Sequence, residues 1–249
     1  MDTLFYSVPS TNVVVVLNEL QREVNLGSTV RTLLNTGFDR LRLVDPVVYD
    51  PARIEDMAHR SAALVEHIEH CATLDDALAD VDYVVGFTAR HRADRRAQSL
   101  TRIGPLLRQL SIQAPVALLF GREDWGLDNA AIERCTHLVH IPTDPAYPSL
   151  NLADAVLLAL YELRRAPATA PEFASAPLPA THQEMAATFD LIDQLLRSLR
   201  FGPSPGSHSA TMRILRDLLS RAATDEREAA LIQALCRKIL RAQDPPDNA

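Results

Sequence analysis

Up to about residue 165, short apolar runs alternate with stretches in which apolar residues recur every three or four positions. The runs consist almost entirely of valine, leucine and isoleucine, which is typical of strands covered on both faces of a parallel sheet. The intervening stretches have the spacing of amphipathic helices. Strand followed by helix, repeated along the chain, predicts an α/β fold with a parallel sheet. Strands are predicted at 12–17, 40–44, 82–87, 115–121 and 137–142, and helices at roughly 26–37, 52–66, 74–80, 103–110, 128–134 and 150–164.

The pattern changes after residue 165. Residues 166–182 are rich in proline and alanine and carry almost no charge, which predicts an extended, semi-rigid linker. Three helical patterns follow within 183–243, the first two separated by the breaking sequence "GPSPGSHS". A helical unit of this size is small for independent stability, so we expect it to pack on the first domain or on a partner chain. The predicted organisation is therefore a main domain (1–165), a linker (166–182) and a helical extension (183–243).

Composition excludes several classes of protein. No apolar run is long enough to cross a bilayer, and the N-terminal residues lack the pattern of a signal peptide, so we expect a cytoplasmic protein without a membrane partner. The three cysteines are too widely spaced for a disulfide framework, and no cluster of histidine or carboxylates has metal-ligand spacing. We therefore expect no metal.

Positive charge is unevenly distributed along the chain. The formal net charge of −7 does not by itself suggest a nucleic-acid-binding protein. However, the segment "ARHRADRRAQSLTR" concentrates arginines after a predicted strand, and they could follow an RNA backbone or form a solvated surface. The RNA-binding candidates there are Arg90, Arg92, Arg95 and Arg96.

Common nucleotide and hydrolase motifs are missing. The chain has no G-x-G-x-x-G after its first strand, no G-x-x-x-x-G-K-[ST] and no G-x-S-x-G. Three other segments stand out because each follows a predicted strand, and ligands of open parallel sheets bind beyond the carboxyl ends of strands. They are "NLGSTVR" (25–31), "FGREDWGL" (120–127) and "IPTDPAYPSLNLADAV" (141–156).

Read singly, each segment has an ordinary explanation. Arg31 could be a surface residue of a helix, and the two glycines of "FGREDWGL" could form a plain strand-to-helix turn. Ser149 or Asn151 could simply cap the helix that follows, since either side chain can accept from first-turn amides. Their order and spacing together suggest one site.

Taken together, the three segments resemble the motifs of the TrmH/SpoU branch of the SPOUT RNA methyltransferases. The first resembles N-x-G-x-x-x-R, the second F-G-x-E-x-x-G-L and the third I-P…S-L-N-L-A-x-A-V. Within that branch the chain is most similar to the TrmJ subgroup, including its C-terminal helical extension with the break "RFGPSPG". The resemblance covers nearly the whole chain.

This resemblance implies a deep trefoil knot in the C-terminal part of the sheet, with S-adenosylmethionine bound in the knot. It also implies a homodimer in which the partner chain completes each site. The implied catalytic residues are Arg31, Asn25, Glu123 and Asn151. The implied cofactor-binding residues are Phe87, Thr88, Ala89, Gly121, Gly126, Ile141, Pro148, Ser149 and Leu150.

The implied reaction is attack of a ribose 2′-hydroxyl on the methyl group of the sulfonium. The target implied by the subgroup is cytidine or uridine at position 32 of the tRNA anticodon loop. In the family, the residue matching Arg31 is proposed as the base. A guanidinium rarely loses its proton, so Arg31 could instead hold a phosphate beside the target ribose.

Two alternatives stay open at this point. One is the same chemistry on another tRNA or rRNA nucleotide. The other is an RNA-binding protein that keeps the fold without catalysis, although the presence of Arg31, Glu123, Ser149 and Asn151 favours an enzyme.

Overall fold

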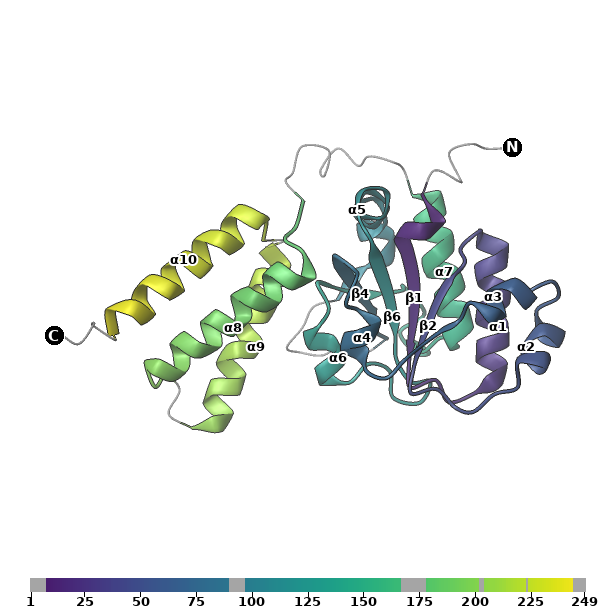
Figure 1. The fold of residues 1–249 in the computed structure, drawn as a ribbon, viewed down its shortest axis with the longest axis horizontal. Coiled ribbons are helices and arrows are strands. Elements are labelled where there is room, and N and C mark those ends of the chain that lie inside the picture. The colour runs from purple at the N-terminus through teal and green to yellow at the C-terminus, as the bar shows by residue number, and fades with distance from the viewer. Residues whose placement is uncertain (1–7, 90–96, 167–177, 202–203, 223, 244–249) are drawn as a thin grey trace. The chain divides into compact units, whose positions relative to one another are not determined.

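The computed structural model describes residues 8–89, 97–166, 178–201, 204–222 and 224–243. These residues form two compact units, one ending at residue 166 and one beginning at residue 178. The first unit alternates strands and helices, and the second is helical (Figure 1).

The sheet of the first unit, as far as the structure describes it, has seven strands in the order β3-β2-β1-β6-β4-β7-β5. All neighbouring strands run parallel, which confirms the predicted α/β class with a parallel sheet. Every residue of β1 and β6 is buried, which explains why these strands show no polar alternation. The strands are β1 (Val13–Asn18), β2 (Arg40–Val44), β3 (Glu69–Cys71), β4 (Tyr83–Phe87), β5 (Gln98–Ser99), β6 (Val116–Phe120) and β7 (His137–His140).

Helices connect the strands and then build the second unit. Those of the first unit are η1 (Ser10–Asn12), α1 (Glu23–Thr36), α2 (Pro51–Met57), α3 (Ala62–Glu66), α4 (Leu74–Ala77), α5 (Leu100–Gln113), α6 (Asn129–Glu133) and α7 (Leu152–Arg165). Those of the second unit are α8 (His182–Ser198), α9 (Pro205–Ala222) and α10 (Glu226–Gln243).

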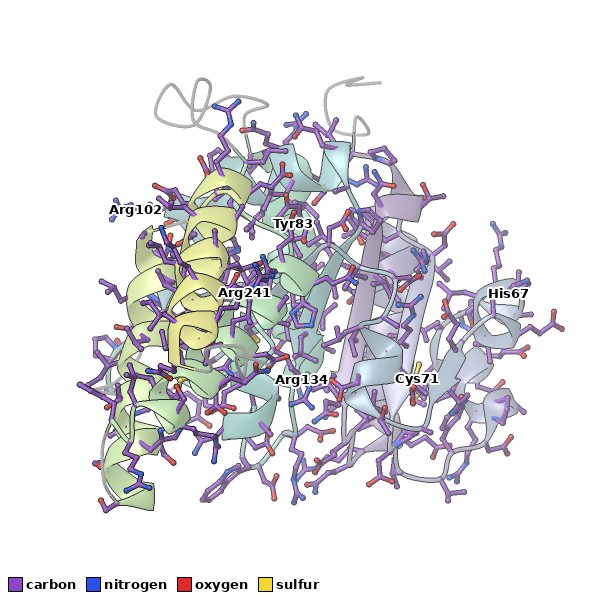
Figure 2. All side chains as sticks on the ribbon, turned by 60° about the vertical axis from the view of Figure 1, so that its left-hand side comes forward. His67, Cys71, Tyr83, Arg102, Arg134 and Arg241 are labelled. Carbon is purple, nitrogen blue, oxygen red and sulfur yellow. The ribbon has the colours of Figure 1, made fainter. Side chains whose placement is uncertain are left out.

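Both faces of the sheet are covered. On one face Val14 and Val16 of β1 pack with residues of α4 and α6 in a single apolar cluster. Arg134, labelled in Figure 2, follows α6 and donates from Nε to Asp75 of α4 at 2.5 Å, so an ion pair links these two helices. Helices α1 and α7 pack together on the other side of the sheet (Figure 1).

Several predicted elements need correction. The predicted helix 52–66 is two helices, α2 and α3, because the chain reverses at Arg60, whose φ is +65°. Strands β3 and β5 were not predicted, since two or three residues are too short to show a period. Helix α1 begins at Glu23 rather than residue 26, so Asn25 lies within its first turn. The predicted break at 202–209 is shorter than expected, because α9 already begins at Pro205.

The helical unit has a small apolar core. Helix α8 packs against both α9 and α10, and the buried residues are Phe189, Ile192, Met212 and Cys236. Thr181 and Glu184 form a capping box at the start of α8, which fixes where the helix begins. Just before it, Pro179 bridges to Asp225, so residues 178–181 of the predicted linker belong to this unit. Residues 167–177 of that linker lie outside the described residues.

No helix in the described part of the chain is long and apolar enough to cross a membrane.

Candidate active site

A cavity of about 310 Å³ lies at the carboxyl ends of β4, β6 and β7. Because these strands are parallel neighbours, the loops that follow them leave the sheet at one edge. The volume is within the range of small-molecule sites. The lining residues are Phe87, Thr88, Ala89, Phe120, Gly121, Arg122, Glu123, Asp124, Trp125, Gly126, Ile141, Pro148, Ser149, Leu150, Leu152 and Ala155.

All the residues predicted to bind the cofactor line this one cavity, although they come from three separate loops. They are Phe87, Thr88, Ala89, Gly121, Gly126, Ile141, Pro148, Ser149 and Leu150. Sequence reasoning did not select Phe120, Arg122, Asp124, Trp125, Leu152 or Ala155 for the site. Phe120, Leu152 and Ala155 belong to the quoted motifs themselves. Arg122, Asp124 and Trp125 stand between motif residues of the loop after β6, and only their nearness in the chain could have indicated them.

Two stacked aromatic rings form part of the cavity wall. The rings of Phe87 and Phe120 lie with centroids 4.5 Å apart and planes 10° from parallel. They end the neighbouring strands β4 and β6, and both side chains are buried apart from the surface that they give to the cavity. The wall therefore offers a flat apolar surface beside backbone groups of the loops.

The loop after β6 turns back tightly on itself. The amide of Gly126 donates to the carbonyl of Arg122 at 2.7 Å, and Gly126 has a φ of +71°. A Cβ atom on Gly121 would lie 2.4 Å from the carbonyl carbon of Gly126, closer than real contacts allow. Both glycines are therefore required by the backbone path of this loop.

The Glu123 carboxylate holds this loop against the start of α1. Oε2 accepts from the amide of Gln21 at 2.9 Å, and Oε1 accepts from the amide of Arg22 at 3.1 Å. Oε1 also accepts from Nδ2 of Asn25 at 2.9 Å. The sequence singled out Glu123 and Asn25, but these two amide partners could not be foreseen.

Asn25 continues the connection to the third segment. Its Oδ1 accepts from Nδ2 of Asn151 at 3.0 Å, while Oδ1 of Asn151 accepts from the amide of Ala153 at 2.9 Å. Asn151 is thus the N-cap of α7, one of the two caps that the sequence allowed, and it also contacts the first motif. The three segments converge through the chain Glu123–Asn25–Asn151, and Asn25 at its centre is only 4% exposed.

Arg31 lies elsewhere on α1. It is exposed and is not among the residues that line the cavity. The structure therefore brings Asn25, Glu123 and Asn151 together but places Arg31 outside this group. The predicted RNA-binding residues Arg90, Arg92, Arg95 and Arg96 lie outside the described residues.

Arg122 is a charged residue of the cavity wall that the sequence did not indicate. Its Nε lies 3.1 Å from Oδ1 of Asp124, and its Nη1 lies 3.3 Å from Oε2 of Glu19. The hydrogen bonds that Arg122 donates to Asp124 and Glu19 raise the pKa of the guanidinium, and the bond to Asp124 lowers the pKa of that carboxyl group. Arg122 therefore carries its charge at every physiological pH and ties the loop to the end of β1.

Among the described residues, no group of three or more histidines, cysteines or carboxylates is placed to hold a metal ion.

The model of the SpoU rRNA Methylase family matches residues 12–161. A tRNA (cytidine/uridine-2'-O-)-methyltransferase TrmJ from Pectobacterium atrosepticum is 31% identical over 239 residues, covering 94% of this chain and 98% of that protein. A protein of the same name from Klebsiella pneumoniae is 32% identical over 241 residues, covering 92% of this chain and 96% of that protein.

Among solved structures, TrmJ from Z. mobilis aligns with a TM-score of 0.71 at 24% identity, covering 91% of this chain and 98% of that chain. This likeness shows that the fold is shared. The family match spans more than half of the chain, and the two relatives extend the similarity to nearly all of it. The resemblance inferred from the three motifs is thereby confirmed, and the chain belongs to the SpoU rRNA Methylase family.

Proposed function

We propose that this protein transfers the methyl group of S-adenosylmethionine to the ribose 2′-hydroxyl of tRNA, at cytidine or uridine 32 of the anticodon loop. Support comes from membership of the SpoU family and from relatives named tRNA (cytidine/uridine-2'-O-)-methyltransferase. A tRNA substrate would place the reaction in the cytoplasm.

The observation that carries this proposal is the hydrogen-bond chain from Glu123 through Asn25 to Asn151. It joins the first motif segment to the two later segments, which supply residues to the cavity wall. Side chains separated by about a hundred positions would not share such contacts unless the loops are held in one arrangement. We infer that the chain fixes these loops around the methyl donor.

The cavity suits S-adenosylmethionine in size and chemistry. The stacked rings of Phe87 and Phe120 give an apolar surface for a purine, and the backbone of the loops at Gly121 and Ser149 supplies polar groups. When bound, the cofactor supplies an activated methyl group on a sulfonium. The residues of the chain then position that methyl group and the incoming hydroxyl, which accounts for much of the rate of such a transfer.

Arg31 is proposed to act on the RNA side of the reaction. It could hold the phosphate beside the target ribose through paired hydrogen bonds, or it could help to remove the hydroxyl proton. Because a guanidinium rarely loses its proton, we favour the phosphate role.

In a homodimer, Arg31 of one copy would lie at the cavity of the other copy. Exposed residues Val24 and Arg31 share one face of α1, and the neighbouring helix α7 exposes Leu157, Leu158 and Tyr161. Adjacent helices with exposed apolar side chains are typical of a protein–protein contact. We propose that a second copy covers this surface and that Arg31 of one copy serves the cavity of the other.

We also propose that the carboxyl-terminal part of the sheet is threaded as a trefoil knot. In support, β6 and β4 are neighbours, β7 lies beyond β4, and α7 then returns to pack on α1. The loops at 121–127 and 141–151 both contribute residues to one cavity. Such closeness is expected if one segment is threaded through the loop that the other forms.

Mapping of ribose methylation tests the proposed function. In tRNA from a strain that lacks the gene, the 2′-O-methyl group at position 32 should be absent and should return with the wild-type gene. Loss at another tRNA or rRNA nucleotide instead would support the same chemistry on a different target. Unchanged methylation everywhere would indicate a protein that binds RNA without catalysis.

A further inference from the structure

One large aromatic side chain lies exposed on the wall of the cavity. Trp125 is the single tryptophan of the sequence, and 58% of its surface is exposed. It is among the residues that line the cavity, between Asp124 and Gly126. A tryptophan exposed to this extent beside a binding site suggests contact with a ligand or partner.

The loop that carries Trp125 is held in place at both ends. Gly126 bonds back to Arg122, and the Glu123 carboxylate accepts three N–H groups from the start of α1. The indole is therefore presented by a fixed backbone. A rigid aromatic surface loses little conformational entropy when a flat ligand stacks on it.

A second exposed aromatic residue belongs to the third segment. Tyr147 is 80% exposed and directly precedes Pro148, which lines the same cavity. Its amide donates to the carbonyl of Asp144 at 3.0 Å, so a tight turn holds it. Each of the two loops thus carries an exposed ring.

The surroundings of Trp125 favour a nucleobase over a protein surface. Its loop neighbours Arg122, Glu123 and Asp124 are charged, whereas α1 and α7 of the same unit each expose apolar side chains. A base has an apolar face for stacking and polar edges that tolerate charged neighbours. A protein contact would instead place apolar side chains around the indole.

We propose that Trp125 stacks on the base of the target pyrimidine nucleotide, with Tyr147 supporting the same loop of RNA. This proposal rests on the proposed function, since it names how that site holds its substrate. It makes Trp125 a residue that binds the substrate base and leaves the methyl donor to the rest of the cavity wall.

The single tryptophan makes a direct binding test possible. We would saturate the protein with S-adenosylhomocysteine and titrate an RNA hairpin that carries the anticodon loop, while following tryptophan fluorescence. Stacking predicts quenching by the hairpin and much less by a blunt duplex of the same stem. Equal fluorescence with and without the hairpin, at concentrations where binding is shown independently, would overturn the proposal.

Variants test the same point in catalysis. Loss of one stacked base costs roughly 5- to 150-fold in affinity, so Trp125→Ala should raise the KM for tRNA by that order. Because Trp125 also lines the cavity, the affinity for S-adenosylmethionine is measured separately by calorimetric titration; stacking predicts that it changes less than the KM for tRNA and that Trp125→Phe recovers most of the loss. Phe201→Ala is the matched control, because Phe201 is 56% exposed but belongs to the helical unit.

The results separate this proposal from the proposed function. If wild-type protein methylates tRNA and Trp125→Ala has an unchanged KM, or a KM raised no more than that of Phe201→Ala, the stacking proposal fails alone. If wild-type protein methylates no tRNA while the hairpin still quenches Trp125, the proposed function fails and stacking stands. Conversion of Trp125→Ala to a monomer in sedimentation would overturn stacking in favour of a subunit contact.

Discussion

At the scale of single residues, Asn25 connects the other two motif segments. Its amide nitrogen donates to Glu123, its amide oxygen accepts from Asn151, and almost no surface is exposed. An amide with both ends satisfied has a fixed orientation. The pattern N-x-G-x-x-x-R therefore begins with a residue whose role here is to hold two loops in register.

Glu123→Gln tests this connection. The variant keeps the size of the side chain but replaces one acceptor oxygen by an amide that faces N–H donors. Because an unmatched polar contact costs about 1–3 kcal/mol, we expect binding of S-adenosylmethionine to weaken by roughly 5- to 150-fold. Calorimetric titration measures this, with Glu66→Gln at an exposed position of α3 as the control. Wild-type affinity in Glu123→Gln would contradict the role given to the carboxylate.

Among the helices and strands, the long, buried ones could be predicted from the sequence, whereas the short strands and the irregular break at Arg60 could not. The valine run of β1 and the periodic α7 were predicted within two residues, because burial imposes a clear period. The break at Arg60 carries no glycine or proline and was not foreseen. The residues of the cavity wall could be predicted only from the similarity of the motifs, because no local pattern shows that loops far apart in sequence lie together.

The loop after β6 gives an element-scale prediction. Gly121→Ala places a methyl group against the backbone of Gly126, which cannot move without opening the turn. We expect weaker cofactor binding by at least tenfold and a lower melting temperature of the α/β unit. Gly206→Ala in α9 is the matched control, because its added methyl group meets no atom within 4 Å. A fully active Gly121→Ala would show that this turn is not needed.

Strand β7 contains a group that makes stability depend on pH. Burial lowers the pKa of His137 to about 4 from an ordinary 6.5. Between these values the unfolded chain binds a proton that the folded chain does not, so acidification favours unfolding. The stabilising effect of a neutral His137 is therefore complete above about pH 6.5 and is lost as pH falls towards 4.

Chemical denaturation from pH 7 to pH 4 checks this prediction. The free energy of unfolding of the wild type should fall more steeply across that window than that of His137→Asn, which carries no titrating group at this position. Equal slopes for the two proteins would mean that His137 titrates normally in the folded state.

At the scale of the whole molecule, the proposed dimer explains why Arg31 does not line the cavity of its own chain. Arg31→Ala alone should lower methyl transfer by at least a hundredfold while cofactor affinity stays unchanged. Mixed dimers of Arg31→Ala with a cofactor-site variant such as Gly121→Ala should regain part of the activity, because one intact cavity then meets one intact Arg31. No recovery in proven mixed dimers would place Arg31 in its own chain's site.

On the function proposed above, the three converging segments direct a methyl group to one ribose hydroxyl of tRNA. The most direct measurement compares methyl transfer by the purified protein to an unmodified tRNA and to the same tRNA with 2′-deoxyribose at position 32 only. We expect transfer to the first tRNA, located at position 32 by mass spectrometry, and none to the second. Equal transfer to both tRNAs would contradict this expectation.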